Sequence, residues 1–120
     1  MARVKTLARE ELDPRQLELY DRIAGVPEAV RGPFKAWLHS PELCDRIEAL
    51  GKYVRFDSDV SLFLKEIAIL QVARTYTCQY MWIAHQSFVL QAGVPQDYID
   101  AIATSAIPAF KHEDARVVHE

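Results

Sequence analysis

Several residue types and patterns are scarce in this sequence, and each scarcity excludes a class of protein. Two cysteines are too few for a disulfide framework, so we expect a cytoplasmic chain with reduced thiols. No apolar run approaches the ~20 residues of a membrane span, and the opening residues, MARVKTLAREELDP, lack the apolar segment of a secretion signal. Basic residues are scattered over a chain of net charge −3, which excludes a basic face for nucleic acid or an anionic membrane.

Glycine is scarce as well, with four residues, and no run of serine, glycine and proline could act as a linker. Half of the 120 residues are apolar and 26% are charged, which is typical of a chain that folds around a core. Neither an internal repeat nor a low-complexity tract interrupts the sequence. We therefore predict one domain that spans residues 1–120.

Helix start and stop signals organise the first half of the chain. Asp13 can cap a helix whose first turn contains Pro14, and apolar residues follow at helical spacing. Ser40 and Pro41 repeat this signal, and the helix that they begin can end at Gly51. We therefore predict a helix after each of the two signals.

The second half of the chain contains the strongest helical pattern. Residues 58–76 are apolar over a broad arc, so this helix should be central to the fold. Thr77 can cap a second helix that ends at Gly93. Residues 53–56 could form a short strand, but no other segment is a convincing partner for it. The predicted fold class is therefore all-α.

The stretch TCQYMWIAHQ places rare residues on one helical face. This face consists of Cys78, Met81, Trp82, His85 and Val89, at positions i, i+3, i+4, i+7 and i+11. In the ordinary interpretation such a stripe packs into a core, and its cysteine and histidine have no chemical role. A functional interpretation stays open beside it.

Three observations favour chemistry. Cys78 lies at a predicted helix N-terminus, where backbone N–H groups and the helix dipole favour the thiolate. Glu66 interrupts the apolar segment LFLKEIAILQVA, and a buried carboxylate needs a partner. If the two helices pack side by side, Glu66 can meet His85 and form a general-base pair. We therefore expect the acid, the thiol and the imidazole around one shared apolar hollow.

Together these residues resemble a known family. The order Glu66, eleven residues, Cys78, six residues, His85, followed by Ala-Gly-Val at 92–94, is similar to the carboxymuconolactone decarboxylase family, which includes the alkylhydroperoxidase D proteins. The segments GPFKAWLHSPEL and KEIAILQVAR also resemble that family, and the likeness extends from Leu12 to the C-terminus. The resemblance implies an all-helical fold, built around a helical hairpin and assembled as a homo-oligomer.

The resemblance also implies roles for individual residues. In the peroxidase branch, a C-x-x-C pair works with a glutamate and a histidine that relay protons; Glu66 and His85 match the relay, and Cys78 matches the first cysteine. In the decarboxylase branch, a glutamate four residues before the histidine is followed by a tryptophan, which Trp82 matches. The sequence departs from both branches at Met81, which can neither form a thiolate nor transfer a proton.

Met81 removes the group that would connect Cys78 to His85. These two residues lie about 10 Å apart along a helix axis, beyond hydrogen-bond reach. No disulfide can form between positions 78 and 81. Cys44 is the other cysteine, and its position in an amphipathic helix favours a small core residue over a substitute partner.

The first functional hypothesis is a decarboxylase-like lyase that acts on small carboxylic or lactone substrates. His85 would be the general acid or base, and Glu66 would orient it. Tyr80, Met81 and Trp82 would shape an apolar pocket for this small-molecule substrate. We expect no metal and no other cofactor.

Two further hypotheses stay open. One is a thiol-dependent peroxidase in which Cys78 forms a sulfenic acid that an outside thiol resolves. The other is a helical assembly protein without catalytic activity. The chain stops at Glu120 in what resembles the opening of a helix, so we expect a naturally short or truncated member. Its uncovered apolar surface would then be buried in a homo-oligomer.

Overall fold

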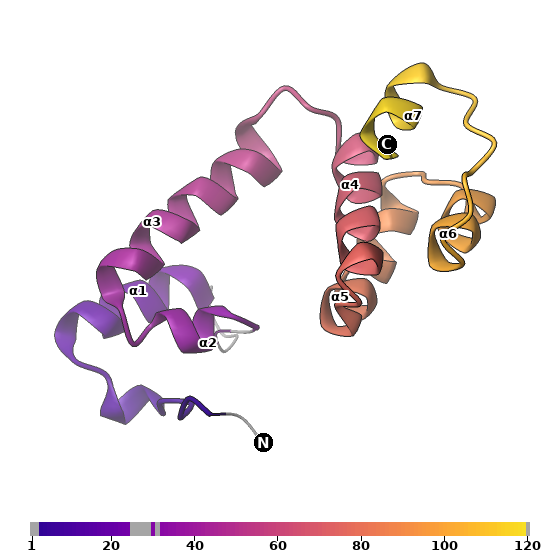
Figure 1. Cartoon of the computed structure of the whole chain (residues 1–120). Coiled ribbons are helices and arrows are strands. Elements are labelled where there is room, and N and C mark those ends of the chain that lie inside the picture. The colour runs from indigo at the N-terminus through magenta and orange to yellow at the C-terminus, as the bar shows by residue number, and fades with distance from the viewer. Residues whose placement is uncertain (1–2, 25–29, 31, 120) are drawn as a thin grey trace. The chain divides into compact units, whose positions relative to one another are not determined.

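The computed structural model describes residues 3–24, 30 and 32–119, and their regular structure is helical (Figure 1). The elements are, in chain order, η1 (Arg9–Glu11), α1 (Pro14–Ala24), α2 (Phe34–Trp37), α3 (Pro41–Lys52), η2 (Tyr53–Asp57), α4 (Leu62–Thr75), α5 (Gln79–Gln91), α6 (Gln96–Ala103) and α7 (Glu113–His119). None of the described residues forms a strand, so the predicted all-α class is confirmed. No helix among them is long and apolar enough to cross a membrane.

The chain divides into two compact units, Met1–Ser58 and Asp59–Glu120. The first unit contains the elements from η1 to η2, and the second contains α4 to α7. That residues 1–120 form a single domain stays a prediction.

In the first unit, α1 and α2 pack against α3 around a small apolar core. α1 begins where the sequence predicted: Asp13 Oδ1 accepts the Gln16 N–H at 2.8 Å, and Gln16 Oε1 accepts the Asp13 N–H at 2.9 Å. These reciprocal bonds satisfy donors that a helix start leaves without intrahelical partners. The buried residues of this core are Leu19, Val30, Leu38 and Cys44.

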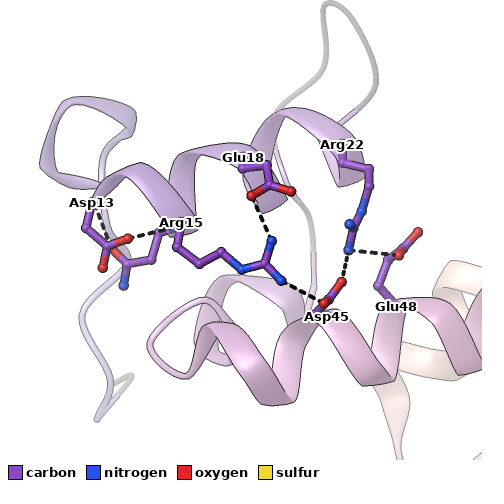
Figure 2. Close-up of polar contacts among 7 residues, drawn as sticks. Asp13, Arg15, Glu18, Arg22, Asp45 and Glu48 are labelled. Carbon is purple, nitrogen blue, oxygen red and sulfur yellow. Dashed lines mark hydrogen bonds and ion pairs between the residues drawn. The ribbon is translucent and has the colours of Figure 1, made fainter.

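Ion pairs join α1 to α3 on the surface of the first unit (Figure 2). Asp45 accepts hydrogen bonds from Arg15, at 2.7 Å, and from Arg22. Arg22 also lies 3.2 Å from Glu48. The hydrogen bond from Arg22 is the main reason that the pKa of Asp45 is held below its ordinary value. Because these groups stay partly exposed to water, the pairs align α1 with α3 more than they stabilise the fold.

The end of α3 differs from the predicted one. Gly51 keeps helical backbone, so α3 continues to Lys52 and passes into the π-helix η2, which takes up residues 53–56. A glycine ends a helix when it turns to left-handed backbone, whereas within a helix it costs only about 1 kcal/mol relative to alanine. The helix ends at Ser58, whose backbone is extended and whose N–H bonds to the Tyr53 carbonyl at 2.9 Å.

In the second unit, α4 packs against α5, α6 and α7, and it is therefore central, as its broad apolar arc predicted. It is shorter than the predicted residues 58–76, because Ser61 is its N-cap. The Ser61 Oγ atom accepts the Leu64 N–H at 3.3 Å. The buried core of this unit consists of Ile67, Leu70, Val89, Val94, Tyr98, Ile102 and Ala115.

Three helices of this unit end in the same kind of turn. After α4, α5 and α6 the chain takes left-handed backbone at Thr77 (φ 49°), Gly93 (φ 76°) and Ser105 (φ 58°). In the first turn, the Cys78 N–H bonds back to the Ala73 carbonyl at 2.7 Å. The prediction that Thr77 caps α5 is therefore wrong. Thr77 ends α4, because the tight return of the chain needs a left-handed residue there, and Cys78 becomes the N-cap.

Candidate functional site

Glu66 of α4 and His85 of α5 form a buried pair. The Nδ1 atom of His85 lies 2.8 Å from Oε2 of Glu66. Only 1% of Glu66 and 7% of His85 is exposed. The contact that the spacing of the two helices predicted is present in the fold, and its use in proton transfer stays a prediction.

The local sequence explains why both side chains point inward. Glu66 lies one turn before Leu70, on the side of α4 that forms the core. His85 lies one turn before Val89, which is buried on α5. The Phe88 ring is 5.6 Å from the imidazole. The pair therefore occupies two facing core positions that apolar residues would otherwise fill.

A carboxylate bonded to an imidazole suits acid–base chemistry. When Nδ1–H of His85 donates to Glu66, the ring has a defined tautomer, and its Nε2 atom can accept a proton. The carboxylate also stabilises the imidazolium that forms when Nε2 is protonated. The arrangement can therefore move a proton to or from a group that reaches Nε2.

Cys78 lies at the start of α5 and borders a pocket of about 270 Å³. The residue is half-buried, and its side chain makes no capping hydrogen bond with the helix. The pocket lies between the end of α4, the first turns of α5 and the end of α6. Its other lining residues are Ala73, Arg74, Thr77, Gln79, Trp82 and Ala103. The thiol is therefore accessible to a small molecule from a concave site.

Neither Glu66 nor His85 lines this pocket, so it is not the shared hollow that the sequence predicted. The first turn of α5 lies beside the end of α6 at the pocket, whereas the middle of α5 packs on α4. Cys78 and His85 are two turns of one helix apart, which is about 10 Å. The thiol and the imidazole therefore occupy separate surroundings.

Of the three predicted pocket residues, only Trp82 lines this pocket. Tyr80 is 56% exposed, and Met81 is half-buried without being part of the lining. Consecutive residues of a helix point about 100° apart, so three in a row cannot all face one site. Tyr80 and Met81 therefore do not line this pocket, and their part in a substrate pocket at His85 stays a prediction.

Arg74 is the charged residue of the pocket, and no sequence pattern indicated a role for it there. Its Nε atom donates to the Ala103 carbonyl at 2.8 Å, which ties the last turn of α4 to the end of α6. A basic residue in the last turn of a helix is common, because it interacts favourably with the helix dipole. Its sequence position alone therefore contained no sign of a role in a pocket.

Cys44 is fully buried in the core of the first unit, as we expected of a small core residue. Burial raises the pKa of its thiol, because the charged thiolate would lose its hydration there. Among the described residues, no three histidine, cysteine, aspartate or glutamate side chains gather as they would around a metal ion. The candidate site therefore consists of the Glu66–His85 pair and the pocket at Cys78.

No curated protein and no solved structure matches this chain. The sequence profile of the carboxymuconolactone decarboxylase family matches residues 41–117, which is more than half of the chain. The matched segment includes α4 and α5, and with them the buried pair and Cys78. Together with the all-helical structure, this match shows that the chain belongs to the carboxymuconolactone decarboxylase family.

Proposed function

We propose that the chain is a lyase that acts on small carboxylic or lactone substrates. In this proposal His85 is the general acid or base, and Glu66 is the residue that orients it. The observation that carries the proposal is the buried contact of 2.8 Å between their side chains. Membership of the carboxymuconolactone decarboxylase family supports it, since the matched segment includes both residues.

The energetics of burial support a chemical role for the pair. Moving a carboxylate and an imidazole out of water costs free energy, which their mutual attraction offsets only in part. Apolar residues of similar volume are often as stabilising at such positions, or more so. A fold that needed only stability would therefore be served as well by two aliphatic side chains. Proton transfer is a better explanation for the presence of the pair.

The proposed reaction uses the Nε2 atom of His85, since Nδ1 is bonded to Glu66. Loss of carbon dioxide from a substrate carboxylate leaves an electron pair on carbon, and protonated His85 can supply the proton that this carbon takes up. Trp82 lies three residues before His85, so the apolar wall of the pocket is on the adjacent turn of α5. A substrate that extends past Trp82 would bring its reacting carbon towards the imidazole.

Carbon dioxide release from a panel of small lactone acids tests the lyase. Glu66→Gln and His85→Gln keep the size of each side chain and remove its acid–base chemistry. We expect each to lower turnover by about 100-fold or more. Gln86→Ala changes an exposed neighbour on the same helix and should leave turnover unchanged. Equal turnover in all variants, or no turnover of any lactone acid by the native chain, would count against the lyase.

A second function, the thiol-dependent reduction of peroxides, is favoured by the position of Cys78. Cys78 is half-buried at the start of α5 and lines the same pocket as Arg74, so its thiol can meet a small molecule there. Attack on a hydroperoxide would give a sulfenic acid and an alcohol. Two outside thiols would then restore Cys78 and leave as a disulfide with water, because Met81 cannot resolve the sulfenic acid.

Peroxide consumption in the presence of dithiothreitol tests this second function. Cys78→Ser should abolish the catalysed part of the consumption, and Cys44→Ala, which removes the buried cysteine, should keep it. Undiminished consumption by Cys78→Ser would exclude a peroxidase based on this thiol. Failure of both the lyase test and the peroxidase test would leave the third hypothesis, a helical assembly protein without catalytic activity.

We also propose that the chain forms a homo-oligomer. Large apolar side chains stay exposed on the α4–α5 hairpin and the turn between its helices, and they are Val72, Tyr76, Tyr80, Ile83 and Leu90. Apolar surface of this kind on a single chain is typical of contacts between subunits. Light scattering during size-exclusion chromatography should give a mass of at least two chains, and the mass of one chain would contradict the proposal.

A further inference from the structure

The pocket at the start of α5 contains groups that the proposed proton transfer does not use. Its walls come from three elements of the second unit: the end of α4, the first turns of α5 and the end of α6. Its volume of about 270 Å³ is near the lower limit of small-molecule sites, about 300 Å³. A cavity of about 150 Å³ in another protein binds benzene. This pocket therefore has room for one small ring with a substituent.

The permanent charge in the pocket has one sign. Among its lining residues Arg74 is cationic, and none is an aspartate or a glutamate. The bond from its Nε atom to the Ala103 carbonyl holds the guanidinium in place. An arginine anchored in this way can still present the donors of its two terminal nitrogens to a planar anion. The pocket therefore favours a negatively charged ligand.

The start of α5 adds to this preference. The side chain of its N-cap, Cys78, makes no capping hydrogen bond, and the first turn contains no acidic residue. The positive end of the helix dipole is therefore not offset by groups of α5 itself. By itself this helix end would not define a site, but it borders the same concavity as Arg74.

The remaining lining residues include an apolar surface made by Trp82, Ala73 and Ala103. A tryptophan and an anchored arginine that line the same pocket suit a ligand with a flat apolar body and one carboxylate. We propose that this pocket binds a small organic carboxylate, with Arg74 selecting the charge and Trp82 packing against the apolar body. The assignment of this ligand as the substrate rests on the proposed function, whereas its binding does not.

Tryptophan fluorescence measures this binding directly. The chain has two tryptophans, Trp37 in the first unit and Trp82 in the pocket, so a Trp37→Phe variant reports on Trp82 alone. Benzoate, neutral benzamide and inorganic phosphate separate the effect of charge from that of the ring. Benzoate should bind at least about tenfold more tightly than either of the others, because it alone has both features. Equal affinity for benzoate and benzamide, or no binding of benzoate, would overturn the proposal.

Arg74→Gln identifies the residue that selects the charge. We expect benzoate affinity to fall at least about tenfold, to the level of benzamide. Arg46→Gln makes the same change of charge at an exposed position of α3 and should leave benzoate binding unchanged. Because Arg74 also holds the Ala103 carbonyl, thermal unfolding is followed for each variant. If Arg74→Gln does not fold, the ratio of benzoate to benzamide affinity in the Trp37→Phe protein decides the question.

The same titration in His85→Gln distinguishes this inference from the proposed function. His85 does not line the pocket, so benzoate should bind as tightly as before even when turnover is lost. Selective benzoate binding without turnover of any lactone acid would sustain the pocket and refute the lyase. Turnover of lactone acids without selectivity for benzoate would refute the pocket assignment and sustain the lyase.

Discussion

The two units of the chain place their charged groups in opposite ways. In the first unit, Arg15, Arg22, Asp45 and Glu48 pair on the surface between α1 and α3, and the buried core contains three aliphatic residues and Cys44 (Figure 2). In the second unit, a carboxylate of α4 and an imidazole of α5 meet inside the core. The surface pairs stay partly exposed to water, whereas the buried pair has exchanged its hydration for one contact.

The two arrangements serve different purposes: the surface pairs of the first unit align helices, whereas the buried pair of the second unit suits proton transfer. Removing one member of a surface pair leaves its partner in water, but removing one member of the buried pair leaves an uncompensated group in an apolar core. The cysteines follow the same division, since Cys44 is part of the first core and Cys78 borders the pocket of the second unit. Substitutions should therefore have larger effects in the second unit than at the surface pairs of the first.

The largest effect is expected from removing one partner of the buried pair. His85→Ala should lower the free energy of unfolding of the second unit by about 3–5 kcal/mol, because Glu66 stays buried without its partner. Urea unfolding followed by Trp82 fluorescence, in the Trp37→Phe background, measures this change for the second unit.

Replacing both partners is the matched control. Glu66→Leu combined with His85→Leu fills the two positions with apolar side chains, so it should recover most of the lost stability. Turnover should stay absent in this double variant. A double variant as unstable as His85→Ala would show that the pair is a structural requirement of the core. The buried charges of the second unit would then serve stability, and the contrast with the surface charges of the first unit would not hold.

The next effect concerns the two cysteines. In the folded protein, Cys78 should react with iodoacetamide at least about tenfold faster than Cys44, a difference of about 1.4 kcal/mol in activation free energy. Cys44 is fully buried, and burial raises the pKa of its thiol, so little reactive thiolate forms there. Mass spectrometry after timed labelling gives both rates, which should converge in urea. Equal labelling rates in the folded protein would contradict the assignment of Cys44 to a core and Cys78 to an accessible pocket.

A smaller gain of stability is expected at the turn between α4 and α5. Left-handed backbone costs a residue with a side chain about 1–2 kcal/mol, so Thr77→Gly should relieve strain. Part of this gain is offset by the greater freedom of glycine in the unfolded chain, which leaves about 0.5–1 kcal/mol. Urea unfolding measured through Trp82 should show this increase.

Gly93→Ala is the matched change in the opposite direction. Gly93 has the same kind of backbone after α5, and beyond its two chain neighbours no residue has an atom within 4 Å of the Cβ that alanine would add. Only backbone strain is therefore introduced, and the second unit should lose stability. A loss of stability in Thr77→Gly would show that the threonine side chain contributes more at this turn than its backbone strain costs.

The smallest effect is expected at the surface pairs of the first unit. The hydrogen bond from Arg22 lowers the pKa of Asp45, so this carboxylate stabilises the folded unit above its unfolded pKa of about 3.9. That stabilisation is lost as pH falls through the lower pKa of the folded state. Trp37 fluorescence in a Trp82→Phe background should show a loss below about pH 3.9 that is smaller in Asp45→Asn. An equal loss in both proteins would mean that the pair does not contribute.

Helix boundaries were predictable where hydrogen bonds between near neighbours define them. At the start of α1, the side chains of Asp13 and Gln16 each accept a hydrogen bond from the other residue's backbone N–H. The two residues are three positions apart, which is less than one helical turn. Gly51 and Thr77 were assigned the wrong roles because the same residue types serve at helix ends, inside helices and in turns. Which role they take depends on how the chain continues, and on the helix against which the following segment packs.

The sequence by itself determined the all-helical class and the pairing of Glu66 with His85. Helical periodicity fixes which residues share a face, and a tight connection brings the faces of α4 and α5 together. Only the tertiary structure decided that Cys78 borders a pocket with Arg74 and is separate from the pair. Arg74 bonds to a carbonyl 29 residues further along the chain, at the end of α6. No local pattern encodes such a contact, because it depends on where a later helix ends in space.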